Sequence, residues 1–310
     1  MRSGLHVIIL LGCIVSGGFG QTLSELPLAG LVVLDWKTNP DVPRVYSGFD
    51  KTGGSEIGPR EFFVSPSGRF FLIQGSSADY PNPLRIFNSE IKLAASIDPE
   101  SYGIDKVLLF DDENIVFSTS GENTAIRLLA WPKTALVMEA QLPLAAEAIS
   151  LLRAEMKDKR YFIDAYYPGD RKTRLIFDPA SRMIDSLESQ GAEVGKEEQS
   201  ERYGLPLDTV FRVTRRDGLA RSIAPISYRR TDSIKAWVGY WNLEQSSANA
   251  WETSEYYLVK EISGKRNVYR LGGTDIFALY EPRMRIARNG DIYVLYCDKK
   301  LRIRIDKLKG

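Results

Sequence analysis

The sequence predicts an all-β fold built from repeated units of four strands. Hydrophobic residues recur mainly with a period of two, in short runs that Gly, Pro, Asn and Asp interrupt, and almost no stretch keeps a period of 3.6. The segment from Gly58 to Pro99 shows the unit most clearly, because it holds four such runs in about 42 residues. The runs are GPREFFV before the turn SPSG, then RFFLIQG, PLRIF and IKLAASI.

The end of the chain repeats the first three of these strands and lacks the fourth. EPRMRIARNG, DIYVLYC and KLRIRID follow the same order within residues 281–306. A three-stranded unit would leave an unpaired strand edge. The run GLVVLDW, residues 30–36, has no partner in the first unit, so we predict that it pairs beside LRIRID and completes the last one. The alternative is that residues 30–50 form a separate small hairpin.

Two series of recurring positions give the number of units. The first is the turn between the first and second strands, and the second is the arginine at the start of the third strand. The turns lie at Gly68, Asn114, Lys159 and Gly290, and the arginines are Arg85, Arg127, Arg174 and Arg302. The first steps are 46 and 45 residues for the turns and 42 and 47 for the arginines. The last steps, 131 and 128 residues, each hold three further steps of about 43 or 44.

Both series therefore predict six units, with five as the alternative. Two of the six fall between Ser186 and Gly273, where Arg212 and Lys260 lie close to the positions expected for the third strands.

The unit resembles the NHL repeat of β-propellers. The resemblance lies in the Gly58-Pro59 opening, the Gly68 turn between two apolar strands, and a third strand that begins with Arg85. It is strong in the first and last units, fair in the second and third, and poor from 186 to 273. It implies an NHL-repeat or TolB-like six-bladed β-propeller forming a single domain over residues 21–310. It implies little about function, because such propellers serve as binding modules, scaffolds and sometimes enzymes.

Residues 1–20 have the layout of a signal peptide. Arg2 provides a positive start, residues 5–15 are nearly all apolar, and small residues precede Gln21, where we expect cleavage. The apolar run is shorter than the ~20 residues that span a bilayer. We therefore expect a periplasmic or secreted bacterial protein whose mature chain has no transmembrane span.

An alternative interpretation of the leader starts from residues 10–13, Leu-Leu-Gly-Cys, which resemble a bacterial lipobox. In that case the protein is a lipoprotein anchored at Cys13.

Composition narrows the chemistry that the mature chain can perform. The single histidine, His6, lies in the leader, so the mature chain lacks the imidazole that Ser-His-Asp or Cys-His catalysis and His-ligated metal sites require. The 41 basic and 40 acidic residues give a net charge of +1, which offers no reason to expect nucleic acid as a partner. Cys297 is the only cysteine after the leader, so no intramolecular disulfide can form, and we predict a buried, inert thiol.

Candidate binding residues lie in the loops that join second to third strands, because in a propeller these loops gather around one mouth of the central channel. Aromatic and charged side chains recur there and suit contacts with a protein or peptide, or alternatively with a small molecule or sugar. The candidates are Tyr80, Tyr167, Asp170, Arg171, Trp241 and Trp251. The competing interpretation is that the aromatic residues pack over the blades.

Carboxylates provide the alternative route to function. Residues 111–113, Asp-Asp-Glu, form the densest cluster and offer oxygen ligands for calcium, but a tight turn equally explains them. Asp79, Glu122 and Asp170 fall in mouth loops, and two facing carboxylates are what a glycosidase needs. The sequence thus identifies no catalytic residue, metal ligand or cofactor. It favours a binding or scaffolding module, with a carboxylate-based, calcium-dependent or metal-free hydrolase or lyase as the alternative and a structural part of a larger assembly as a third hypothesis.

Basic residues cluster in residues 212–230 and 299–309. In the second cluster they alternate with Leu301, Ile303 and Ile305, which predicts a strand with one apolar face and one charged face exposed to solvent. The alternative is a basic rim that binds an acidic partner or lipid headgroups. The polar residues 189–204 are predicted to form a long surface loop.

Overall fold

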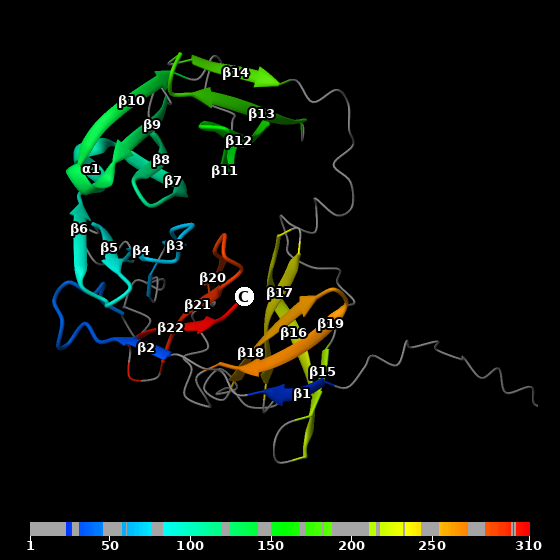
Figure 1. Ribbon diagram of the computed structural model, residues 1–310. Helices are drawn as coiled ribbons and strands as arrows, with labels where there is room; N and C mark the ends of the chain where they lie inside the picture. Colours follow the sequence, from blue (N-terminus) through cyan, green and yellow to red (C-terminus); the bar gives the residue numbers. More distant parts are fainter. Residues whose placement is uncertain are drawn as a thin grey trace, which may run out of the picture.

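The computed structural model is all-β, and its antiparallel sheets follow one another around an arc (Figure 1). It describes residues 23–26, 31–45, 58–59, 61–75, 83–119, 125–141, 150–167, 171–181, 183–187, 211–214, 218–231, 233–242, 254–271, 283–298, 300 and 302–310, some of them by their backbone alone. The predicted signal peptide and the predicted loop 189–204 lie outside these residues. Within the described part of the chain, no helix is long and apolar enough to cross a membrane.

The first sheet is the four-stranded unit predicted between Gly58 and Pro99. Its strands pair antiparallel in chain order: β3 (Glu61–Val64), β4 (Phe70–Gln74), β5 (Leu84–Asn88) and β6 (Leu93–Ile97). The turn between β3 and β4 is closed by a hydrogen bond of 2.8 Å from the Gly68 N–H to the Ser65 carbonyl. Gly68 has a φ of 71°, a left-handed conformation that favours glycine.

The second and third sheets repeat this arrangement. The second consists of β7 (Ile104–Phe110), β8 (Asn114–Thr119), β9 (Ala125–Ala130) and β10 (Ala135–Gln141), and the short helices α1 (Pro99–Tyr102) and η1 (Trp131–Lys133) adjoin it. The third consists of β11 (Ser150–Lys157), β12 (Arg160–Tyr167), β13 (Arg171–Asp178) and β14 (Met183–Leu187). Lys159 lies in the turn between β11 and β12, and Asn114 directly follows the turn between β7 and β8 as the first residue of β8. Arg127 and Arg174 lie in third strands, as predicted.

The last sheet confirms that an N-terminal strand completes it. β20 (Arg283–Ile286), β21 (Ile292–Cys297) and β22 (Ile303–Leu308) come from the end of the chain, and β2 (Leu31–Leu34) pairs antiparallel with β22. The register joins Leu31 to Asp306 and Leu34 to Ile303. Figure 1 shows β2, in blue, beside β22, in red.

Residues 211–271 differ from the predicted two blades. Six strands form a closed circuit of pairings, which we call the barrel: β1 (Leu23–Leu26), β15 (Phe211–Thr214), β16 (Ala220–Arg230), β17 (Ile234–Asn242), β18 (Ser254–Ile262) and β19 (Lys265–Arg270). The first half of β16 pairs with β15 and the second half with β17, and the change occurs near Pro225, which has no N–H to give to a ladder.

The prediction of six blades is therefore not confirmed, since the described residues hold five sheet units. Lys260 lies in β18, the third strand of the unit β16–β19, as the spacing predicted. Arg212 instead lies on β15, which pairs with β16 and β1. Its position in the series is coincidental, because the additional strand β15 occupies the expected place of a third strand.

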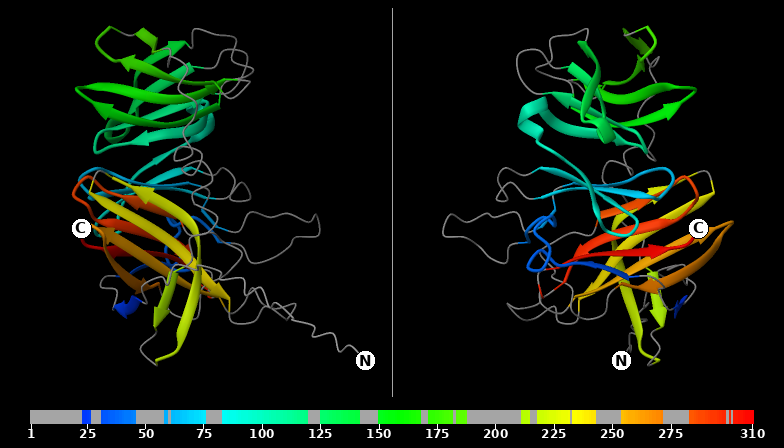
Figure 2. Two further views of the ribbon diagram at one scale, coloured as in Figure 1. Left: turned by 90° about the vertical axis from the view of Figure 1, so that its right-hand side faces the viewer. Right: turned by 60° about the vertical axis from the view of Figure 1, so that its left-hand side comes forward.

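The first strands of successive units lie side by side in the order β16, β20, β3, β7 and β11, which is a propeller-like radial arrangement (Figure 1). Figure 2 shows from two other sides how the sheets follow one another, from the barrel in yellow and orange to the third sheet in green. Each pair of neighbouring units encloses its own apolar core, and a further core fills the barrel. Both faces of most sheets are therefore buried, which explains strands such as β21 whose six residues are all buried.

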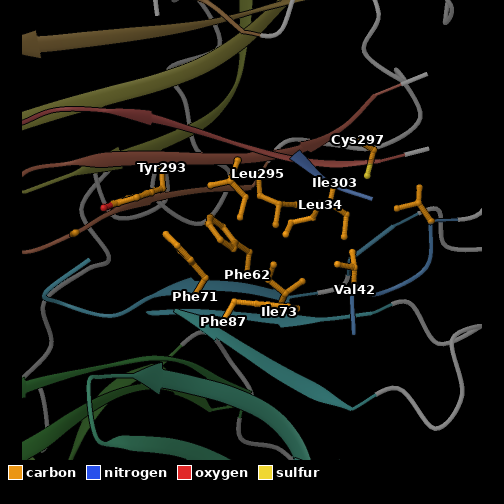
Figure 3. Packing of buried hydrophobic residues seen from close by; sticks show 13 residues of the cluster. Leu34, Val42, Phe62, Phe71, Ile73, Phe87, Tyr293, Leu295, Cys297 and Ile303 are labelled. Carbon is orange, nitrogen blue, oxygen red and sulfur yellow. The ribbon is translucent and has the colours of Figure 1, made fainter. Parts of the chain in front are cut away.

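The core between the first and last sheets contains the N-terminal strand. Leu34 is 2% exposed and lies in this core with Phe62, Phe71 and Ile303. Figure 3 shows the side chains of the two sheets directed toward one another. The rings of Phe71 and Tyr293 meet edge to face with centroids 5.4 Å apart.

We expect the Leu34→Ala substitution to lower the free energy of unfolding by about 3 kcal/mol, because it leaves a cavity in this core. Val33→Ala is the matched control: Val33 lies in the same strand but is 39% exposed, so its replacement should cost about 1 kcal/mol or less. Urea unfolding followed by tryptophan fluorescence measures both. Equal losses for the two variants would contradict the burial of β2 against the first sheet.

Gly68→Ala tests a contact between the first and last sheets. A Cβ at Gly68 would lie 2.6 Å from the Tyr293 hydroxyl and would keep a φ of 71°. Gly218 has a φ of 81° and nothing within 4 Å of such a Cβ. We expect Gly218→Ala to cost about 1 kcal/mol for the backbone alone, and Gly68→Ala about 2 kcal/mol more. The additional loss should shrink in a Tyr293→Phe background; an unchanged loss there would show that the contact is not its cause.

Candidate functional site

The turns between the first and second strands of neighbouring sheets contact one another on one face of the arc of sheets. The Ser67 hydroxyl donates to Oδ1 of Asp112, and the Ser67 backbone N–H donates to Oδ2 of the same carboxylate at 3.3 Å. The Tyr293 hydroxyl donates to the Gly68 carbonyl at 3.5 Å. These contacts join the turns of the last, first and second sheets.

The remaining two units follow the same pattern. Tyr161, at the start of β12, packs in one core with Leu108 of β7 and Val116 of β8. Burial and the negative charges of Asp111 and Glu113 raise the pKa of Tyr161 to about 12. In the barrel, Ile234 begins β17 and lies against Gly290 in the β20–β21 turn. Because strands alternate in direction within each unit, the ends of the second strands and the starts of the third strands lie on the opposite face of the arc, which we call the connection end.

Of the six binding residues predicted from the sequence, the structure describes three. Tyr80, Asp170 and Trp251 lie outside the described residues. Tyr167, Arg171 and Trp241 are described by their backbone alone. Tyr167 pairs with Arg171 next to the connection 168–170, and Trp241 pairs with Glu255 next to the connection 243–253.

The best-defined connection is the turn from β21 to β22, which Asp298 organises. Its Oδ1 accepts the backbone N–H groups of Lys300 and Arg302, both at 3.0 Å. Its Oδ2 accepts from the Arg302 guanidinium at 2.7 and 2.9 Å and from Arg304 Nε at 2.8 Å. Burial raises the pKa of this carboxyl, but the bonds from Arg302 and Arg304 outweigh it, so the pKa lies below its usual range.

A second buried pair joins β21 and β22 farther from the turn at Asp298. The Tyr296 hydroxyl donates to Asp306 at 2.9 Å, and Asp306 is 3% exposed. Burial, then the adjacent Asp306 charge, raise the pKa of Tyr296. Tyr296 also belongs to the core between the last sheet and the barrel.

The prediction that the charged face of this strand is exposed to solvent is confirmed only in part. The side chains of Arg302 and Arg304 are 23% and 16% exposed. They lie on the face directed toward the barrel, where Asp298 pairs with both. Lys307 lies on the other face, over the Tyr293 ring, and pairs with Asp291 at 2.8 Å. The sequence alternation was identified correctly, but the neighbouring unit that covers this face was not.

At the connection end of the barrel, Glu255 is fully buried, and sequence reasoning missed it. Its Oε1 accepts from Arg270 Nη2 at 2.8 Å, and its Oε2 accepts from the Tyr257 hydroxyl at 2.6 Å. The available signal was a carboxylate directly before the apolar run YYLV, residues 256–259, where a charge must be paired if it is buried.

Cys297 is buried and reduced, as predicted. Burial, and then the charge of Asp298, raise the pKa of its thiol, which opposes formation of a reactive thiolate.

The cluster of residues 111–113 behaves as a turn. Asp111 Oδ1 accepts the backbone N–H groups of Glu113 and Asn114 at 2.8 and 2.6 Å. No group of three metal-ligating side chains of the kind His, Cys, Asp or Glu occurs among the residues that the structure describes. Asp79 and Glu122, candidates for glycosidase chemistry together with Asp170, lie outside them.

The low pKa of Asp298 predicts how stability depends on pH. An ionised Asp298 stabilises the fold above the unfolded-state pKa of about 4, and this contribution disappears as the pH falls toward the lower folded-state pKa. We expect Asp298→Asn to cost about 3 kcal/mol at pH 7, with the difference from wild type shrinking below about pH 4. Exposed Asp105→Asn is the control and should change stability by less than about 0.5 kcal/mol. A loss that does not depend on pH would contradict the role of the charge.

No protein-family model matches this sequence, and no curated protein is similar to it, so the resemblance to NHL repeats is not confirmed. Among solved structures, TolB from Acinetobacter baumannii is 11% identical over 81% of this chain and 55% of that chain, with a TM-score of 0.32. An uncharacterized protein from Listeria monocytogenes is 12% identical, covering 77% and 74%, with a TM-score of 0.36. The β-propeller domain of the Trilobed protease from Pyrococcus furiosus is 10% identical, covering 82% and 71%, with a TM-score of 0.29. This chain spans about half the length of TolB. TM-scores below 0.5 assign neither a family nor a function to this chain, whose fold is defined by its own strand pairings.

Proposed function

We propose that this chain is a binding or scaffolding module that contacts a protein or peptide partner through its connection end. The observation that carries the proposal is that the strands bordering this end are locked by buried side-chain hydrogen bonds. Asp298 holds the turn after β21, Glu255 joins the start of β18 to the end of β19, and Thr119 Oγ1 accepts the Ala125 N–H at 3.0 Å across the connection 120–124.

Rigid strand ends that carry loops are suited to recognition. Binding residues are concentrated on loops that a rigid scaffold positions, and pre-organised strand ends reduce the entropy lost on binding. The buried carboxylates Glu255 and Asp298 already accept hydrogen bonds from arginines, so their role is to hold the loops in position. In this proposal the partner is contacted by the strand-end residues Tyr167, Arg171 and Trp241. The residues Tyr80, Asp170 and Trp251, which the sequence assigns to the intervening loops, make the remaining contacts.

The proposed location is the bacterial envelope or the medium, after cleavage of residues 1–20 before Gln21. The mass of the purified mature chain tests this part: a mass that includes residues 1–20 contradicts cleavage, and a diacylglycerol-modified chain beginning at Cys13 supports the lipoprotein alternative.

The partner contact is tested by photo-crosslinking in the native envelope. We expect a crosslinker placed at Trp241 to capture a partner, and the Tyr80→Ala, Trp251→Ala double variant to lower the yield about tenfold, because aromatic anchors dominate such interfaces. The control is a crosslinker at Glu90, an exposed residue in the β5–β6 turn at the opposite end. The same partner captured equally from both positions would contradict the proposal.

A further inference from the structure

The N-terminal strand β1 fills a slot in the barrel and is bonded along both of its edges. Its first half pairs parallel with β15, Leu23 with Val213 and Ser24 with Thr214. Its second half pairs parallel with β19, Glu25 with Val268 and Leu26 with Tyr269. The slot therefore recognises the backbone of an extended segment of four residues.

The walls of the slot cover the interior of the barrel. Val213 and Val268 are completely buried in the barrel core with Phe211, Trp237 and Tyr257. Without β1, β15 and β19 would each have an unpaired edge above this core. An empty slot is thus an unfavourable state, and any strand of suitable sequence that fills it gains backbone hydrogen bonds on both sides.

β1 is held separately from the rest of the N-terminal segment. Ser24 is exposed and Leu26 is 37% exposed, so these two outward residues contribute little burial. β2 follows after the four residues 27–30, belongs to a different sheet and is anchored by Leu34 in a different core. Figure 1 shows β1 beside β15 and β2 beside β22, so the two strands are bonded to different sheets.

We propose that the slot between β15 and β19 is a strand-acceptor site that takes residues 23–26 of a second copy of the chain in exchange for its own. The two occupants are chemically identical and make the same contacts, so only their concentrations at the slot differ. A short linker gives the chain's own strand an effective concentration on the order of 1 mM. Exchange between copies therefore becomes appreciable when the protein is locally concentrated, as in an assembled scaffold, and this property is independent of the partner contact proposed above.

Cysteine trapping in the full chain detects the exchange. Copies carrying only Ser24→Cys are mixed with copies carrying only Thr214→Cys, so a disulfide between these paired positions can form only between two chains. We expect a covalent dimer whose yield rises steeply between about 10 μM and 1 mM. The control mixture replaces Thr214→Cys with Ser96→Cys, an exposed position on β6 in another sheet. Equal dimer yields in the two mixtures, or none at 1 mM, would overturn the proposal.

A second measurement examines the slot itself after the protein has folded. A protease site is inserted between β1 and β2, the folded chain is cut there, and a fluorescent peptide with the sequence of residues 21–28 is added. We expect saturable binding that unlabelled peptide displaces, and about tenfold weaker binding of a peptide with Ser24→Pro, since proline removes a donor and opposes the ladder. Permanent retention of the chain's own strand, or its loss without peptide binding, counts against a strand-acceptor site.

Discussion

The pairing of β2 with β22 joins the two ends of the chain and supports the neighbouring units on both sides. Leu34 lies on the face of this sheet that packs against the first sheet. Val294 and Tyr296 lie on the opposite face and pack against the barrel. β1 precedes β2 by only four residues and closes the barrel. A single N-terminal segment therefore completes two units, and hydrophobic burial across β2 favours the geometry in which both are complete.

Buried charges specify the ends of strands in this fold. Taking Asp298 and Glu255 out of water is costly, and the cost is offset only because each carboxylate receives several well-placed hydrogen bonds. Such networks tolerate few alternative geometries, so they define where β21 ends and where β18 begins. Apolar packing holds the sheets together, and these polar contacts determine the shape of the connection end.

We base two proposals of recognition on these features. The proposed partner contact uses the strand ends that the buried hydrogen bonds of Asp298 and Glu255 hold in position. The proposed strand exchange uses the β15–β19 slot, which binds the extended backbone of the chain's own N-terminal strand.

The sequence by itself determined the four-stranded unit, the turns at Gly68 and Gly290 and the borrowed strand β2, because alternating hydrophobicity and turn residues are local signals. It also predicted the buried thiol of Cys297 from the apolar strand around it. Only the tertiary structure decided that residues 211–271 close into a barrel, since the partners of β15 and β19 lie in the distant strand β1. The same reason explains Arg304 and Glu255: whether a charge faces solvent or is buried depends on the sheet that packs over it, and strand periodicity carries no information about that neighbour.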